Sequence, residues 1–229
     1  PRDRAVMLIA EAFIDWGWIG SHLDEIWEKV AEHLVLTGIA LGVGLVISLA
    51  LAALALRFRR SYTPITWLTG TLYSIPSLAL FAFLVPITGF TTLTAEFGLV
   101  SYTLLILIRN IVAGIDGVPP DIKEAALGMG YGRLRLFFEI ELPLALPVIV
   151  AGMRIAAVTT SGLVTVTALI GKAGLGFFIL RGLQRFFSTV GSTEILLGTA
   201  LSVVLAVIVD VTLLLVERAL TPWARRRAA

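Results

Sequence analysis

Long runs of apolar residues, separated by short polar segments, dominate the chain. A membrane-spanning helix needs about 20 consecutive apolar residues, and five runs of roughly this length are present. The runs are continuous and do not alternate between apolar and polar positions, which argues against a β-barrel. We therefore predict an all-α integral membrane protein with five transmembrane helices, at about residues 34–56, 65–85, 97–115, 144–170 and 195–216.

The composition supports a lipid-embedded chain. Hydrophobic residues make up 58 per cent of the 229 positions and charged residues 15 per cent, with a mean hydropathy of +0.94. A soluble domain is nearer half apolar and a quarter charged, so a cytosolic enzyme, a nucleic-acid binder and a secreted disulfide scaffold are excluded. The chain has no cysteine, and its two histidines, His22 and His33, both precede the first apolar run. We therefore expect no metal site and no histidine-based catalytic site inside the membrane.

The distribution of lysine and arginine predicts the orientation, because short cytoplasmic loops are enriched in these residues. The segments that follow the first, third and fifth spans must share one side, and together they hold ten basic residues. The opposite side holds six, of which three lie in the segment at residues 171–193. We therefore predict an N-terminus outside the cell and a basic cytoplasmic tail at residues 221–229.

Residues 1–33 form an external segment before the first span. Within residues 11–33, apolar side chains recur at steps of three and four, which is typical of an amphipathic helix. Such a helix either lies along the outer membrane surface or packs on the transmembrane bundle, and both alternatives remain open. The apolar positions are Phe13, Trp16, Ile19, Leu23, Ile26, Trp27 and Val30.

The segment between the third and fourth spans, at residues 118–143, predicts a short helix–turn–helix in the cytoplasm. Pro119 and Pro120 end the preceding helix, and Asp121 is placed to cap a new one with Glu124 as its capping-box partner. Glycines at positions 128 and 130 then end that helix or permit a turn. A second helix is expected at residues 133–141, after which Pro143 opens the fourth span.

The same segment resembles the EAA signature of the permeases of binding-protein-dependent ABC importers. In that family the loop forms a coupling helix that docks on a cytoplasmic ATPase, and the fold has five core spans with an external N-terminus. The resemblance implies that residues 34–220 form the permease domain and that the loop couples it to the ATPase. The matching positions are Glu124, Ala125, Ala126, Gly130, Ile140, Leu142 and Pro143.

Other segments resemble the glycine betaine/carnitine/choline branch of this family, namely residues 73–80, 107–110, 114–119 and 141–147. The resemblance implies import of a quaternary-ammonium osmoprotectant such as glycine betaine, choline, carnitine or proline betaine. Residues 161–167, SGLVTVT, and Lys172 depart from the pattern of that branch. A permease for another small solute, such as an amino acid, is therefore the alternative.

Partners and cofactors follow from what the chain lacks. It has no G-x-x-x-x-G-K-[ST] phosphate loop, so we expect it to be non-catalytic and free of cofactors, with ATP and magnesium on a separate ATPase. The resemblance implies two cytoplasmic ATP-binding subunits and an external or periplasmic substrate-binding protein. A second permease copy, or a similar permease, would enclose the pathway with this chain in the inner membrane of a prokaryote. We expect no nucleic acid.

Two other classes of protein fit the sequence less well. An intramembrane serine protease would need a base beside Ser161, but no histidine follows the first span and Lys172 lies at a span end. A stand-alone channel or secondary transporter would often show an internal repeat, and none is visible. The sequence also shows no pattern typical of an aromatic cage for a quaternary ammonium group. Trp67, Tyr73 and Tyr102 are expected to be interfacial or packing residues.

Three ionisable residues fall deep within the predicted spans, namely Arg109, Arg154 and Asp210. Unpaired charges in lipid are costly, so each should have a partner. At about 1.5 Å rise per residue, Arg109 and Asp210 both lie roughly 12 Å from the cytoplasmic end of their spans. We therefore predict an Arg109–Asp210 pair as a structural clamp, with Arg154 as the competing partner and a transport gate as the alternative role. Gly38 and Gly42 are expected to pack within the bundle.

Overall fold

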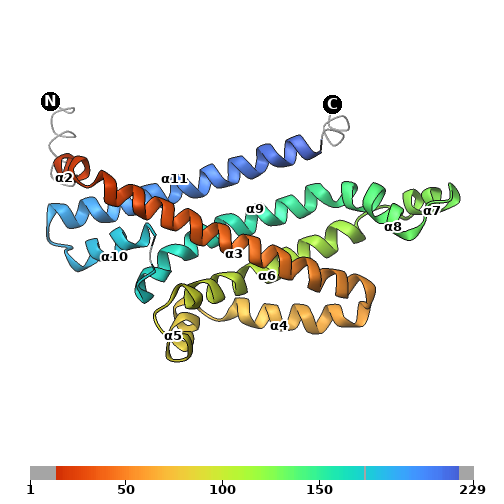
Figure 1. The fold of residues 1–229 in the computed structure, drawn as a ribbon, viewed down its shortest axis with the longest axis horizontal. Coiled ribbons are helices and arrows are strands. Elements are labelled where there is room, and N and C mark those ends of the chain that lie inside the picture. The colour runs from red at the N-terminus through yellow and green to blue at the C-terminus, as the bar shows by residue number, and fades with distance from the viewer. Residues whose placement is uncertain (1–13, 173, 222–229) are drawn as a thin grey trace. The chain divides into compact units, whose positions relative to one another are not determined.

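The fold is entirely helical over the residues that the structure, a computed structural model, describes: 14–172 and 174–221 (Figure 1). The first 13 residues and nearly all of the predicted basic tail lie outside these ranges. The elements are α2 (Trp16–Ser21), α3 (Leu23–Arg57), η1 (Arg59–Ser61), α4 (Tyr62–Ser74), α5 (Ser77–Thr88), α6 (Thr92–Asp116), α7 (Pro120–Gly128), α8 (Arg133–Leu136), η2 (Phe137–Glu141), α9 (Leu142–Val166), η3 (Thr167–Ile170), α10 (Gly176–Gln184) and α11 (Thr189–Leu220).

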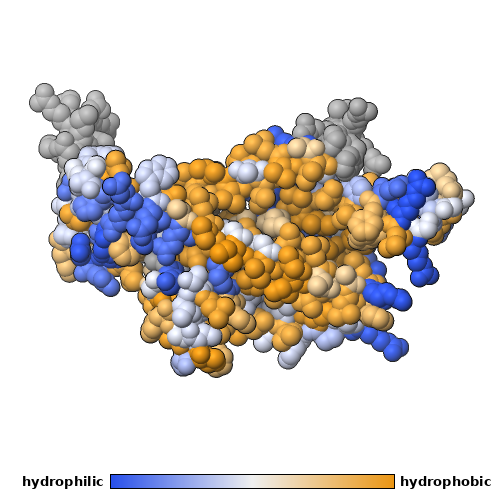
Figure 2. All heavy atoms as spheres, viewed as in Figure 1, coloured by the Kyte–Doolittle hydropathy of each residue, from blue (hydrophilic) through white to orange (hydrophobic). Residues whose placement is uncertain are grey.

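The described helices include four candidate membrane spans, or five if one bent pair of helices is a single span. Among the described residues, α3, α6, the helical stretch Arg133–Ile170 and α11 are each long and apolar enough to cross a membrane. The pair formed by Arg59–Ser74 and Ser77–Thr88 meets the same criterion together, with a bend of 96° between the two helices, and corresponds to the predicted second span. Apolar side chains cover the surface over α3 in Figure 2, as expected of a helix surrounded by lipid. The predicted all-α class with five spans is therefore confirmed.

The second span is broken in the middle, which the sequence analysis did not anticipate. Ile75 ends α4 with an extended backbone (φ −67°, ψ 128°), and Pro76 is also extended (φ −55°, ψ 132°). A proline disfavours the helical conformation of the residue before it and cannot donate a backbone hydrogen bond. The break at Ile75 and Pro76 therefore follows from the local sequence, although the apolar run continues through it.

The chain divides into two compact units, and four helices contribute residues to both. Unit 1 contains residues 1–40, 76–99 and 159–207, and unit 2 contains residues 41–75, 100–158 and 208–229. In unit 2, residues of α3, α6 and α9 form an apolar core around Leu107, Ile108 and Ala156. In unit 1, Leu175 and Phe178 are fully buried and pack with Ile26 and Leu205.

The amphipathic residues before the first span form no separate surface helix. Asp15 caps the short α2, its Oδ1 atom accepting a hydrogen bond from the Trp18 amide at 2.9 Å. The chain then enters α3 at Leu23 and stays helical to Arg57, because no glycine or proline interrupts its first turns. Ile26 is only 8% exposed and joins the unit 1 core. Trp16, Leu23 and Trp27 are 65%, 51% and 69% exposed, and Phe13 lies outside the described residues, so one side of this segment packs on the bundle while the other stays open.

Two of the three cations at residues 171–193 form ion pairs within unit 1. Arg181 on α10 contacts Glu25 of α3, with Nη1 and Oε1 2.8 Å apart, and its Nε lies 2.6 Å from Oε1 of Glu194 on α11. Glu194 is fully buried and also lies 3.7 Å from Arg185. Acidic residues of unit 1 thus compensate Arg181 and Arg185, two of the three cations.

Glycines in unit 2 permit close contact between α6 and its neighbours. A Cβ atom on Gly152 of α9 would lie 2.3 Å from the Cβ of Asn110, and one on Gly44 of α3 would lie 2.0 Å from the Thr103 hydroxyl oxygen. Gly38 and Gly42, in contrast, are exposed with nothing within 4 Å of such an atom. The expectation that these two glycines pack within the bundle was wrong, because they lie on the opposite side of α3 from its buried positions.

Candidate functional site

The predicted helix–turn–helix is present, but its first helix is capped differently from the prediction. Helix α7 begins at Pro120, its N-cap is Pro119, and no side chain makes a capping hydrogen bond. Asp121 therefore lies inside the first turn, where its negative charge interacts favourably with the positive end of the helix dipole. The predicted capping box of Asp121 and Glu124 was wrong, because proline at the first helical position starts the helix one residue earlier.

The turn after α7 depends on a glycine in the left-handed conformation. Gly130 has φ +86°, a value that glycine adopts without a steric cost. Its amide donates to the Leu127 carbonyl at 2.9 Å, and the Tyr131 amide donates to the Ala126 carbonyl at 3.1 Å. These bonds close the end of α7 and direct the chain into α8.

Lys123 ties α7 to the two spans on either side of the loop. Its Nζ atom lies 2.9 Å from Oε1 of Glu141, at the entry to α9, and donates to the Ile115 carbonyl of α6 at 3.3 Å. A second tie holds the end of α6, where Arg59 and Asp116 form two hydrogen bonds of 2.6 Å each. The loop is therefore fixed to the bundle by polar contacts that the sequence motif did not reveal.

Residues of the EAA signature fall into two groups by exposure. Glu124, Ala125 and Gly130 are exposed, whereas Ala126 is 1% exposed and packs inside the chain. Large apolar side chains surround the exposed group, since Leu127 is 51% and Met129 70% exposed. In Figure 2, hydrophilic and pale side chains gather over α7 and α8, so the exposed surface of this loop is mixed polar and apolar.

The other signature positions shape the entry to α9. The predicted second helix divides into α8 and the π-helical segment η2, in which the Leu142 amide bonds to the carbonyl of Phe137, five residues earlier. Pro143 lies directly after and lacks an amide hydrogen, so regular helical bonding cannot pass through this point. Ile140 lies in η2, and Leu142 packs against the unit 2 core. This half of the signature is structural within the chain.

The intramembrane charges pair differently from the prediction. Asp210 of α11 accepts two hydrogen bonds from Arg154 of α9, at 2.8 and 2.9 Å. Arg154 also lies 3.6 Å from Glu217. The predicted Arg109–Asp210 pair was wrong, and Arg154, named as the competing partner, takes its place. The prediction rested on the similar depths of Arg109 and Asp210 in their spans. Depth alone does not determine the direction in which each side chain points from its helix.

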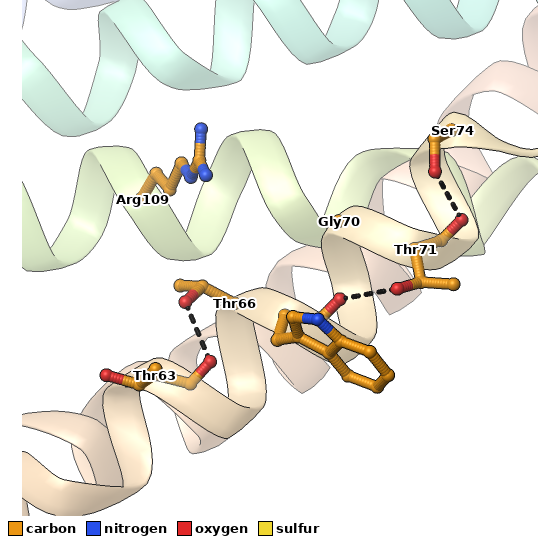
Figure 3. A pocket seen from close by; sticks show the side chains of 7 residues that line it. Thr63, Thr66, Gly70, Thr71, Ser74 and Arg109 are labelled. Atoms are coloured by element: carbon orange, nitrogen blue, oxygen red, sulfur yellow. Dashed lines mark hydrogen bonds between the residues drawn. The ribbon is translucent and has the colours of Figure 1, made fainter.

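Arg109 instead lines a pocket in unit 2 of about 420 Å³. Figure 3 shows it on α6, across from α4, whose polar positions line the rest of the wall. No hydrogen bond or ion pair to the guanidinium was found within residues 14–172 and 174–221. The lining residues are Thr63, Thr66, Trp67, Gly70, Thr71, Ser74 and Arg109.

Ser161 has a histidine neighbour, contrary to the expectation that none is available. His33 Nε2 lies 3.0 Å from the Ser161 hydroxyl, and its Nδ1 accepts a long 3.4 Å hydrogen bond from the Leu175 amide. A neutral ring whose Nδ1 accepts carries its proton on Nε2, so this nitrogen donates to Ser161 and cannot act as its base. Both side chains are buried. The pair therefore joins α3 to α9 and does not form a nucleophile.

The aromatic residues near the broken span pack as expected. The Tyr102 hydroxyl donates to the Ile75 carbonyl, and its ring lies edge-on to Tyr73 with centroids 5.8 Å apart. Trp67 differs, because it is 72% exposed and lines the pocket. Among the described residues, no group of three or more His, Asp or Glu side chains could hold a metal ion.

Comparisons with known proteins agree with this geometry. Residues 26–222 match the family described as the binding-protein-dependent transport system inner membrane component. The choline transport system permease protein OpuBB of Bacillus subtilis is 32% identical over 204 residues, covering 89% of this chain and 92% of its own length. The osmoprotectant import permease protein OsmW of Salmonella typhimurium is 32% identical over 197 residues, covering 83% and 89%.

The solved structures show the same fold. A chain of the MetNI methionine ABC transporter, solved in inward-facing conformations, superposes with a TM-score of 0.67 at 21% identity, covering 91% of this chain and all of the other. This identity supports the fold alone. Since the family match covers most of the chain and the relatives are matched over most of their length, the chain belongs to the binding-protein-dependent transport system inner membrane components.

Proposed function

We propose that this chain is the permease subunit of an ATP-driven importer for a quaternary-ammonium osmoprotectant. Support for the solute class comes from relatives named for choline, carnitine and osmoprotectant transport, each at least 32% identical. Glycine betaine, carnitine, choline and proline betaine are therefore the candidate solutes. Family membership makes the chain one component of a transporter, with an ATPase and a substrate-binding protein as its partners.

The exposed apolar side chains of the coupling loop carry this proposal. Leu127 and Met129 are 51% and 70% exposed, and both lie outside the candidate spans, so in the proposed orientation they face the cytoplasm. Exposed apolar side chains in water indicate a protein partner. The cytoplasmic ATPase fits this surface, because α7 projects Glu124 and Ala125 on its exposed side and is itself fixed to two spans.

The coupling would be mechanical. Two ATPase subunits close on ATP and move two copies of α7, and Lys123 transmits the movement to α6 and α9 through its contacts with Ile115 and Glu141. A loop without these contacts would absorb the movement. In this proposal a second copy of the chain, or a similar permease, completes the pathway, and each permease docks one ATPase subunit.

The proposed orientation places α7 and α8 in the cytoplasm and the N-terminus outside, in the inner membrane of a prokaryote. It rests on the excess of lysine and arginine in the three segments assigned to the cytoplasm.

Solute uptake by cells that express the complete transporter tests the proposal. The permease, its ATPase and its binding protein are expressed together in a bacterium lacking osmoprotectant uptake, and accumulation of labelled glycine betaine, carnitine and choline is measured at high salt. We expect accumulation of at least one solute, and none with an ATPase partner that cannot hydrolyse ATP. Accumulation of an amino acid but of none of these solutes would contradict the proposed substrate class and support the amino-acid alternative.

A further inference from the structure

The pocket of unit 2 is built from one polar side of α4 and one charged residue of α6. Positions 63, 66, 67, 70, 71 and 74 of α4 recur at steps of three and four, so they share one side of the helix. Most of them carry hydroxyl groups or are glycine, although α4 belongs to an apolar span. This side of α4 is thus more polar than the rest of the span, as expected of a wall that contacts a polar ligand.

Arg109 provides the charge in this pocket. The side chain is exposed, and no acidic group contacts it in the part of the chain that the structure describes. An arginine within a span that remains unpaired in lipid is costly, and such residues typically mark solute pathways. Asp210, the nearest candidate from the sequence, is already held by both hydrogen bonds from Arg154.

The donors that remain free in the pocket favour a carboxylate. Thr66, Thr71 and Ser74 each donate their hydroxyl hydrogen to a backbone carbonyl of α4, at 2.9 Å in every case. The guanidinium of Arg109 therefore supplies the charged N–H donors of the pocket, and its planar fork matches a carboxylate with two parallel bonds. Its fixed positive charge would repel a solute with a net positive charge.

Trp67 adds a surface for the other end of a zwitterion. Its indole is 72% exposed and lines the same pocket, and the face of a tryptophan attracts quaternary ammonium groups. We propose that this pocket binds a zwitterionic solute, with Arg109 on the carboxylate and Trp67 beside the quaternary ammonium. Arg109 thereby makes the permease prefer glycine betaine and carnitine to choline, which has no carboxylate. The inference rests on the proposed osmoprotectant function.

Equilibrium binding without the binding protein tests this inference, so that the selectivity of that protein does not interfere. The permease–ATPase complex is placed in lipid nanodiscs, and binding of labelled glycine betaine and choline is measured separately. We expect the wild type to bind glycine betaine more tightly. Arg109→Gln should weaken glycine betaine binding at least about tenfold and leave choline binding unchanged or stronger. Arg109→Lys should retain part of the preference.

Two further variants separate the roles of the pocket residues. Arg57→Gln, which removes an exposed cation of unit 2 outside the pocket, should leave the preference intact. Trp67→Leu should weaken the binding of both solutes to the same extent, because both carry the quaternary ammonium group. If Arg109→Gln weakens the binding of glycine betaine and choline equally, or leaves the preference for glycine betaine unchanged, the inference is overturned. Arg109 would then contact lipid or a second copy of the chain.

The outcomes also separate this inference from the proposed function. If cells accumulate an osmoprotectant but the wild-type complex binds neither solute in nanodiscs, the pocket assignment is wrong and the importer function stands. A wild type that binds choline more tightly than glycine betaine overturns the assignment as well. If cells accumulate no osmoprotectant, the proposed function fails, and the inference fails with it.

Discussion

Arg154 of α9 and Asp210 of α11 form a bidentate ion pair, with Nε to Oδ1 at 2.8 Å and Nη2 to Oδ2 at 2.9 Å. Both residues belong to apolar spans, and each neutralises the other. Glu217, which follows Asp210 on α11, lies 3.6 Å from Nη1 of Arg154. The pair therefore connects two spans of unit 2 and leaves Arg109 available for another role.

The ion pair predicts that a single substitution is worse than replacing both partners. Asp210→Asn and Arg154→Gln should each lower the yield of monodisperse protein after extraction, because the first leaves Arg154 with only its longer contact to Glu217 and the second leaves Asp210 without its partner. The exchanged pair, Arg154→Asp with Asp210→Arg, should recover part of the yield. Size-exclusion chromatography of the extracted protein measures it.

Arg109→Gln is the matched control for this pair. It should not lower the yield, and combining it with Asp210→Asn should recover nothing. Recovery in that double variant would mean that Arg109 and Asp210 are partners after all, and that the observed pair does not stabilise the fold. Unchanged yields together with ATPase activity that no longer needs solute would favour a gate over a clamp.

Lys123 is predicted to transmit movement from the coupling loop. Lys123→Met removes the contacts with Glu141 and Ile115 and should reduce solute-stimulated ATPase activity several-fold, while the complex still assembles. Arg135→Gln is the control, since it breaks an ion pair with Glu139 in the same loop whose side chains are more than half exposed. Surface pairs of this kind contribute little. Equal effects of the two variants would contradict the specific role of Lys123.

Two neighbouring alanines are predicted to respond differently to a bulky side chain. Ala125 is exposed and Ala126 is buried within the chain. Ala125→Trp should prevent co-purification of the ATPase while the loop keeps its resistance to limited proteolysis. Ala126→Trp should make the loop sensitive to proteolysis, because the ring has no space inside it. If Ala125→Trp retains the ATPase, the exposed side of α7 is not the docking surface.

Gly152 and Gly162 offer a matched test of the contact between α6 and α9. Gly152→Ala places a Cβ atom 2.3 Å from the Cβ of Asn110 and should destabilise the protein by about 1–3 kcal/mol. Gly162→Ala lies on the same helix with nothing within 4 Å, so it should be neutral or stabilise by up to about 1 kcal/mol. Thermal unfolding in detergent compares the two. Similar melting temperatures would refute the close contact.

The proposed orientation is testable because the chain contains no cysteine. Single cysteines at Ser61 and Gly132 should react with a membrane-impermeant maleimide only after the cytoplasmic side is opened. Cysteines at Thr92 and Ser192 should react in intact spheroplasts. Labelling of the first two positions from outside, with protection of the other two, would reverse the orientation.

Much of the fold could be read from the sequence, because the hydrophobic signal of a membrane span is local. The run from Leu34 to Leu56 contains no charge, and a backbone in lipid must satisfy its hydrogen bonds internally, so a helix is the available solution. Prolines and glycines likewise predicted the short helices between the third and fourth spans, because they determine where such helices begin and end, and the resemblance to the EAA signature implied that this loop is the coupling loop. Family and fold class followed from these signals.

The tertiary structure decided which side chains meet. Rise per residue gives the depth of Arg109 and Asp210, but the direction of each side chain around its helix depends on how the helices pack. Packing brings Arg154 to Asp210, buries Ala126 beside exposed Ala125, and places His33 beside Ser161 across 128 residues of chain. Sequence spacing constrains contacts along one helix, whereas contacts between helices depend on rotations that no single helix encodes.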